Sequence, residues 1–196
     1  LCTSCQLLQL KHTVPAEAMY RNYWYCSGTN RTMREALADI ANTAETLAHL
    51  TPGETVLDIG CNDGTLLASY RTDGIARIGF DPAENMVPLA RKVADHVVNG
   101  FFSAEGYRSN VDPAKPNPRI VTSIAMFYDL EDPNAFVADV REVMHPNGVW
   151  IVQMSYLPLM LKHNELGNVC HEHLEYYSMR SFDYLLERHD LEIVDA

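Results

Sequence analysis

The chain has 196 residues, a length that suits one domain with a substantial core plus a small appendage. Lysine and arginine number 15 against 26 aspartates and glutamates, and this net charge of −11 argues against a nucleic-acid backbone or an anionic membrane as a partner. No apolar run reaches the roughly 18 residues of a membrane span, and no secretory signal opens the chain. The five cysteines are odd in number and mostly scattered, which is typical of the reducing cytoplasm.

Two cysteines near the start have a spacing that is common in metal sites. Cys2 and Cys5 form a C-x-x-C pair, in which two thiolates can bind one tetrahedral zinc ion. A structural zinc site needs four ligands, and no second C-x-x-C follows, so His12 and Cys26 are the only nearby supplements. Two ordinary thiols explain the pair equally well. A structural zinc on Cys2 and Cys5 is therefore one of two alternatives.

An aromatic segment and a long helix come next. Residues 19–25 are mostly large apolar or aromatic side chains, which must pack on the protein or contact a ligand. Residues 27–30 have the composition of a turn that caps a helix. Apolar side chains then keep helical spacing over residues 33–48, and Thr51-Pro52-Gly53 ends the pattern.

From residue 54 onward strand and helix patterns alternate, which predicts an α/β fold with a mostly parallel sheet flanked by helices. We expect residues 1–28 to be a lid or the remnant of a zinc-binding segment, residues 29–53 a linker helix whose apolar stripe is core, and residues 54–196 the main domain. Strands are expected at residues 54–59, 76–80, 96–98, 119–125, 149–154 and 191–196, and helices at about 64–73, 83–93, 133–144, 157–162 and 182–188.

The first strand of this domain runs into a glycine motif. The spacing is Asp58-x-Gly60-x-x-x-Gly64, and Cys61 and Asn62 lie inside the turn. Such a strand–turn–helix junction leaves backbone N–H groups directed at whatever lies above the strand end. The dinucleotide fingerprint G-x-G-x-x-G is not present. The motif resembles instead the first motif of class I S-adenosylmethionine-dependent methyltransferases, and a turn that merely joins strand to helix is the alternative.

Other candidate cofactor contacts follow the next strands. Asp81 ends the second strand, where nucleotide-binding sheets place an acid that accepts both ribose hydroxyls, although it could also cap the following helix. Phe101 and Phe102 lie at the level of an adenine ring, and either could cover it or belong to the core. Met126 and Phe127 begin a loop that should lie beside the glycine motif and form a wall of the cofactor site.

Residues 170–178 concentrate imidazole, carboxylate, thiol and phenol groups, a density that favours a functional role. Cys170, His171 and His173 are plausible zinc ligands, but His-x-His lacks the spacing that brings two side chains together on a helix. A neutral histidine with a neighbouring carboxylate, here His173 and Glu172, suits acid–base chemistry. A solvated loop with chance histidines is the third interpretation.

Five segments occur in an order that resembles the sugar C-methyltransferase family. They are Cys2-x-x-Cys5-x-Leu7-Leu8-Gln9-Leu10, Met19-Tyr20…Tyr25…Ser27-Gly28, Cys61-Asn62-Asp63-Gly64-Thr65, Phe127-Tyr128-Asp129-Leu130-x-Asp132-Pro133 and His171-Glu172-His173-Leu174-Glu175-Tyr176-Tyr177. The resemblance covers nearly the whole chain and implies a zinc-binding N-terminal domain, a class I methyltransferase core and a C-terminal domain. It further implies S-adenosyl-L-methionine as cofactor and a nucleotide-linked 4-ketosugar of deoxysugar biosynthesis as substrate, methylated beside the ketone through an enolate.

The resemblance also implies residue roles. Glu172 and His173 match the family's Glu-His pair, with His173 as the base, and Tyr25 is chosen over Tyr23 as the tyrosine that reaches in from the N-terminal segment. The implied cofactor residues are Asp58, Gly60, Cys61, Asn62, Gly64, Asp81, Phe101, Phe102, Met126 and Phe127.

The chain also departs from the family. Cys170 stands where some members have tyrosine, an upstream C-x-x-C is missing, and nothing after Ala196 corresponds to the C-terminal domain, so we expect a truncated chain. A nicotinamide-dependent oxidoreductase should show G-x-G-x-x-G and Tyr-x-x-x-Lys, and neither is present. Two further hypotheses stay open: a methyltransferase of another small molecule, and a fragment that binds the cofactor without activity.

Overall fold

A computed structural model describes residues 1–196. The strands are β1 (Leu8–Gln9), β2 (Thr55–Ile59), β3 (Ala76–Asp81), β4 (His96–Asn99), β5 (Ile120–Ile124), β6 (Val149–Gln153) and β7 (Glu175–Tyr176). The helices are α1 (Ala16–Tyr20), α2 (Arg31–Ala48), α3 (Thr65–Ser69), α4 (Val87–Ala90), α5 (Ala104–Asn110), α6 (Pro133–Val143), α7 (Leu157–His163) and α8 (Met179–Glu187).

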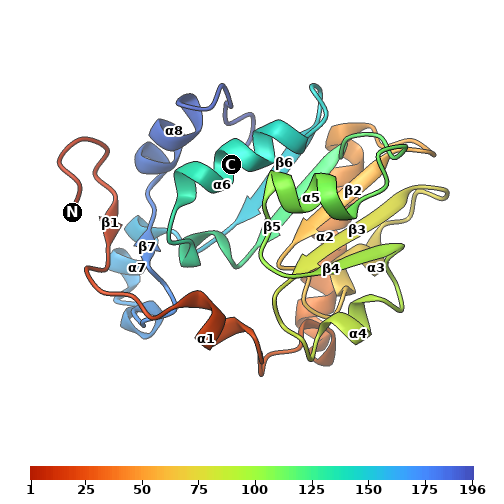
Figure 1. Cartoon of the computed structure of the whole chain (residues 1–196). Coiled ribbons are helices and arrows are strands. Elements are labelled where there is room, and N and C mark those ends of the chain that lie inside the picture. Colours follow the sequence, from red (N-terminus) through yellow and green to blue (C-terminus); the bar gives the residue numbers. More distant parts are fainter.

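Five strands form one parallel sheet in the order β4-β3-β2-β5-β6 (Figure 1). The chain leaves β2 toward β3 on one side and later returns to place β5 on the other side, so the strand order reverses between β2 and β5. In open α/β sheets, ligands bind outside the carboxyl ends of the strands at such a reversal. The parallel α/β fold predicted from the sequence is confirmed, and its topology already indicates where a site should lie.

Helices cover both faces of the sheet. On one face the buried stripe of α2, which contains Leu37, Ala41, Ala44 and Ala48, packs in one apolar cluster with residues of α3, α4 and the sheet. On the other face α5, α6 and α8 pack on a second cluster that includes Phe80. The expectation that the apolar stripe of residues 33–48 is core is confirmed for Leu37, Ala44 and Ala48, but Leu47 is 45% exposed. Asn30 caps α2 as predicted, because its side chain accepts a hydrogen bond from the N–H of Thr32 at 2.8 Å.

The N-terminal residues lie against the C-terminal part of the domain. β1 pairs antiparallel with β7, with Leu8 opposite Tyr176 and Gln9 opposite Glu175. From there the chain passes through α1 toward the start of α2, crossing the carboxyl end of the sheet (Figure 1). None of the helices combines the length and the apolar composition that a membrane crossing needs.

Some predicted elements differ from the observed ones. Residues 191–196 form no strand, so the parallel sheet has five strands and not six. Leu191 and Ile193 pack on the core instead, because an alternating pattern predicts extended chain but cannot supply a strand edge to pair with. The helices predicted at 64–73 and 83–93 are shorter, and α5 was not predicted.

Candidate active site

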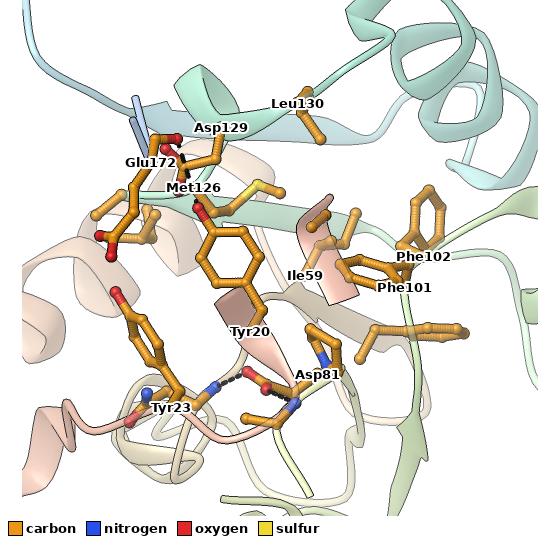
Figure 2. A pocket seen from close by; sticks show the side chains of 18 of the residues that line it. Tyr20, Tyr23, Ile59, Asp81, Phe101, Phe102, Met126, Asp129, Leu130 and Glu172 are labelled. Carbon is orange, nitrogen blue, oxygen red and sulfur yellow. Dashed lines mark hydrogen bonds between the residues drawn. The ribbon is translucent and has the colours of Figure 1, made fainter. Parts of the chain in front are cut away.

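A cavity of about 950 Å³ opens at the carboxyl ends of β2, β3 and β5, where the strand order reverses. This volume lies at the upper end of the range of small-molecule sites, which is about 300–1,000 Å³. Its walls come from α1, residues 23–27, the three strand ends, residues 100–102, the loop after β5, and Glu172 with His173. Figure 2 shows Asp81 and Phe101 at one end and Asp129 and Glu172 at the other.

The glycine motif forms the turn between β2 and α3. Gly60 lines the cavity with φ +77°, a backbone conformation that favours glycine, and a Cβ built there would lie 3.2 Å from Cγ of Met126. The N–H groups of Gly60 and Cys61 both donate to the carbonyl of Phe80, at 2.8 and 3.0 Å. The N–H groups of these two residues are therefore already paired within the protein. What the turn offers a ligand is close approach to the backbone.

Asp81 joins the ends of β2 and β3. Its carboxylate accepts hydrogen bonds from the N–H of Asn62 at 2.7 Å and the N–H of Ala83 at 2.8 Å, one on each oxygen. Burial raises the pKa of Asp81 above its ordinary value, although the two N–H donors act in the opposite direction. The predicted helix cap is not observed, because α4 begins at Val87 with Met86 as its N-cap, and Asp81 instead closes a local turn at Ala83. Each carboxylate oxygen retains acceptor capacity on the side of the cavity, so the ribose role stays a prediction.

Residues 21–28, called the strap below, cross the mouth of the cavity and are tied to the glycine turn. The side chain of Asn62 accepts from the N–H of Ser27 at 2.9 Å and donates to the carbonyl of Tyr25 at 3.0 Å. Asp63 accepts from the N–H of Gly28 at 2.7 Å. These bonds place the aromatic side chains of the strap over the cavity, where Tyr23, Trp24 and Tyr25 all form part of its wall.

A second set of bonds ties the other end of the strap to the loop after β3. Asn85 exchanges two hydrogen bonds with the backbone of Tyr23, at 3.0 and 2.7 Å, and Arg21 pairs with Glu84 at 2.8 Å. The strap is therefore held at both ends by the loops that follow β2 and β3. Any ligand bound at these strand ends lies beneath it.

His173 lines the opposite side of the cavity and has a defined tautomer. Its Nδ1 lies 2.7 Å from the carbonyl oxygen of Asn168, and since a carbonyl can only accept, Nδ1 carries the hydrogen. In the neutral ring Nε2 then holds the free lone pair and can take a proton. The ring also packs edge-on against Tyr128, with 4.5 Å between the ring centres.

Asp129 and Tyr20 form a second polar group that we did not predict from the sequence. Burial raises the pKa of Asp129 to about 8, the nearby Tyr20 hydroxyl lowers it, and the charge of Glu172 raises it further. Tyr20 donates a long hydrogen bond of 3.5 Å to the backbone carbonyl of Glu172. Figure 2 shows the hydroxyl groups of Tyr20 and Tyr23 directed toward Asp129 and Glu172. Two sequence signals pointed to this group: the position of Asp129 in the loop after β5, and the presence of Tyr20 and Asp129 in two of the five segments that carry the family resemblance.

Comparison with known proteins agrees with this geometry. The chain matches a family described as a methyltransferase domain over residues 29–196. The chain belongs to this methyltransferase-domain family. The C-methyltransferase NovU of Streptomyces niveus is 26% identical over 196 residues, which are 100% of this chain and 46% of NovU. The chain thus spans about half the length of the curated relatives it matches.

Two solved structures illustrate the shared fold. The cyclopropane synthase MmaA2 from Mycobacterium tuberculosis superposes with a TM-score of 0.63 at 17% identity, over 91% of this chain and 71% of that chain. The plantazolicin methyltransferase BpumL, solved in complex with SAH, superposes with a TM-score of 0.60 at 15% identity, over 79% of this chain and 62% of that chain. The class I methyltransferase fold predicted from the glycine motif is confirmed.

Four of the cofactor residues predicted from the sequence do not reach the cavity of this methyltransferase domain. Asp58 is 3% exposed, and its carboxylate accepts a 2.6 Å hydrogen bond from the hydroxyl of Thr122 inside the sheet. Burial raises the pKa of Asp58 to about 7, although the Thr122 hydroxyl lowers it. Phe127 is fully buried and packs edge-on against Phe136 and Trp150. Asp58 and Phe127 are therefore core residues beneath the site.

The other two predicted residues outside the cavity wall, Cys61 and Gly64, belong to the turn between β2 and α3 and contribute to its structure. Cys61 is 3% exposed and packs against Gly79, where a Cβ would lie only 2.6 Å from its sulfur. Gly64 caps α3 with φ +82° and lies against Ala90. Gly60, Asn62, Asp81, Phe101, Phe102 and Met126 line the cavity together with Tyr25, Glu172 and His173.

The structure does not support a zinc site. No group of three or more histidine, cysteine, aspartate and glutamate side chains is arranged to hold a metal ion. Cys2 and Cys5 are free thiols, and Cys26 donates to Asp63 at 3.1 Å. Two thiolates leave half of a tetrahedral site without ligands. The zinc predicted as one alternative for Cys2 and Cys5, and the metal alternative for Cys170 with His171 and His173, therefore stay predictions that the structure does not confirm.

The cavity walls are acidic. Five carboxylate side chains line it and no lysine or arginine does; these acids are Glu17, Asp81, Asp129, Glu131 and Glu172. A low-dielectric cleft lined by one sign of charge favours ligands of the opposite sign. These acids therefore favour a positively charged group on a ligand bound in the cavity.

Proposed function

We propose that the chain is the catalytic core of an S-adenosylmethionine-dependent C-methyltransferase acting on a nucleotide-linked 4-ketosugar. The observation that carries the proposal is a single cavity that holds both an oriented histidine and the glycine turn with Asp81. The similarity to the C-methyltransferase NovU over all 196 residues supports carbon as the methylated atom. The assignment of a nucleotide-linked sugar as the substrate rests on the sequence resemblance alone.

The cofactor end of the cavity fits S-adenosylmethionine. Gly60 allows its close approach, Asp81 is proposed to accept the ribose hydroxyls, and Phe101, Phe102 and Met126 are proposed to contact the adenine and the methionine chain. The acidic walls agree with the positive sulfonium of this cofactor. When bound, S-adenosylmethionine supplies the methyl group, which is transferred as the bond to sulfur breaks and a bond to carbon forms.

The substrate end supplies a base. A sugar carbon becomes nucleophilic only after the proton beside the ketone is removed, and Nε2 of His173 is proposed to take that proton. Glu172 and Tyr25 are proposed to hold the substrate in place, since both line the cavity. The backbone carbonyl of Asn168 orients the histidine.

The domain division remains a proposal of the same kind. In this proposal residues 1–28 close the site as a lid. Residues 29–53 are a helix that links this lid to residues 54–196, which form the methyltransferase core.

Two measurements test the function. Calorimetric titration with S-adenosylmethionine and with NAD should show binding of the first alone. Mass spectrometry of reactions with a panel of nucleotide-linked 4-ketosugars should then show one product heavier by one methylene group, with the new methyl on carbon by NMR. A methyl group on oxygen would instead indicate another small-molecule methyltransferase. Binding of NAD, or no binding of S-adenosylmethionine, would overturn the proposal.

A further inference from the structure

Asp129 is a half-buried acid at the substrate end of the cavity, and one of its carboxyl oxygens has no hydrogen-bond partner. Its Oδ1 atom is fully buried and has no hydrogen-bond partner, while the residue lines the cavity. The nearby Tyr20 has one hydroxyl hydrogen, which it directs at the backbone carbonyl of Glu172. Leaving a charged carboxylate oxygen buried without a partner is costly, so this burial favours the neutral form of the carboxyl group.

The surroundings of Asp129 favour the neutral form. The titratable groups that face it are Tyr20 from α1, Tyr23 from the strap, Tyr128 from its own loop and Glu172. None of these carries a positive charge, and no lysine or arginine lines the cavity. Burial and the Glu172 charge raise the pKa of Asp129 to about 8, so it carries a proton near neutral pH. A neutral carboxyl group can donate a hydrogen bond, which a carboxylate cannot.

We propose that Asp129 is a further catalytic residue, whose carboxyl O–H binds the ketone oxygen of the substrate and stabilises the enolate. The inference rests on the proposed function. When Nε2 of His173 takes the α proton, the electrons of the C–H bond form the carbon–carbon double bond and the carbonyl pair moves to oxygen. The hydrogen bond from Asp129 meets the charge that develops there. Methyl transfer restores the ketone, and the proton on His173 is released to solvent.

A first experiment needs no substrate and measures directly whether the carboxyl group of Asp129 is protonated. Infrared difference spectra between the parent and Asp129→Asn, recorded at pH 7, should show that the variant has lost one protonated carboxyl signal. Asp73→Asn, which changes an exposed acid of a surface turn, should leave that signal unchanged. Equal signals in the parent and Asp129→Asn would mean that Asp129 is ionised, and this would overturn the inference.

A second experiment follows the chemistry. With a nucleotide-linked 4-ketosugar in heavy water, Asp129→Ala should exchange the α hydrogen about 10²–10³ times more slowly than the parent, the usual loss for one oxyanion donor. Asp129→Asn keeps an N–H donor and should retain most of the rate. The parent should lose rate as pH rises through about 8, and Asp129→Asn should lack this alkaline limb.

The outcomes separate the two proposals. Parental exchange in Asp129→Ala, or an alkaline limb that persists in Asp129→Asn, overturns the role of Asp129 and leaves the proposed function standing. No exchange and no methylation by the parent with any sugar of the panel overturns the proposed function. It removes the catalytic role with it, while the infrared spectra still report whether Asp129 is protonated.

Discussion

The carboxylate of Asp81 accepts a 2.7 Å hydrogen bond from the backbone N–H of Asn62. This bond joins the ends of β3 and β2, and the side chain of the same Asn62 bonds the strap at Tyr25 and Ser27. Asp81 therefore holds Asn62 in place, and Asn62 in turn holds the strap over the cavity. A change at Asp81 should affect both the ligand contact and the local structure, and the two effects need separate measurements.

We expect Asp81→Ala to weaken S-adenosylmethionine binding by about 1.5–3 kcal/mol, because a carboxylate that accepts ribose hydroxyls would be lost. It should also lower the unfolding temperature, since two N–H groups lose their acceptor. Asp95→Ala is the matched control: Asp95 accepts from the N–H of Arg77 at 2.7 Å and lies outside the cavity wall. The control should lose stability only. Calorimetric affinity of Asp81→Ala within twofold of the parent would refute the ribose assignment.

His173→Asn should abolish exchange of the substrate α hydrogen in heavy water, with a loss of about 10²–10⁴ if the base is removed. Cofactor affinity should stay at the parental value, since His173 lies at the substrate end. His171→Asn is the control, because His171 is exposed and outside the cavity wall. Glu172→Gln should reduce this exchange less than His173→Asn does, because the base itself is retained. If His173→Asn exchanges at the parental rate, the base is another group, and Tyr25 becomes the next residue to test.

Much of the fold could be predicted from the sequence because local signals agree with it. Apolar runs of five or six residues mark β2 and β5, and caps and turns mark α2 and α6. Residues 191–196 misled the prediction, because alternation does not report whether a partner strand exists. The second polar group was missed for a related reason: α1 brings Tyr20 to Asp129 and Glu172 across long stretches of chain.

The glycine motif correctly predicted where the cavity lies, but not which of its side chains line that cavity. Asp58 sits at the strand end in sequence, yet its side chain points into the sheet toward Thr122. Gly60 has φ +77° and lies close to Met126, so a valine there would strain the protein even without cofactor.

Asp63 is expected to hold the strap closed. Burial raises its pKa, but hydrogen bonds from Thr65, Cys26 and Gly28 outweigh this effect, so the pKa lies below 3.8. Asp63→Asn should therefore expose the strap, with faster hydrogen exchange at the amides of Ser27 and Gly28 and faster release of S-adenosylmethionine.

The pH dependence of the strap follows from the same bonds. A lowered pKa means that this stabilisation is present above pH 3.8 and is lost as pH falls through the folded-state pKa. Hydrogen exchange at Gly28 should thus accelerate in acid in the parent but not in Asp63→Asn. Asp39→Asn, an exposed acid on α2, should behave as the parent. Strap amides that stay equally protected in Asp63→Asn would show that this contact does not hold the strap.

Glu175 is an acid buried where β7 pairs with β1, and we expect it to make the stability of the protein depend on pH. It is 7% exposed and accepts a 2.6 Å hydrogen bond from the hydroxyl of Tyr177. Burial raises its pKa from 4.5 to about 7, although the Tyr177 hydroxyl lowers it. The folded protein therefore binds this proton more tightly than the unfolded chain does.

The sign of the effect follows directly from that shift. Below pH 4.5 both states are protonated, and as pH rises toward 7 only the unfolded chain ionises, so the parent loses stability across this window. Glu175→Gln keeps an oxygen that accepts from Tyr177 but cannot ionise. Its free energy of unfolding should match that of the parent near pH 4.5 and exceed it above pH 7, by an amount on the order of 1–3 kcal/mol. Glu187→Gln, on the exposed side of α8, should follow the parent at every pH. A constant difference between Glu175→Gln and the parent from pH 4.5 to 8 would show that folding does not raise the pKa of Glu175.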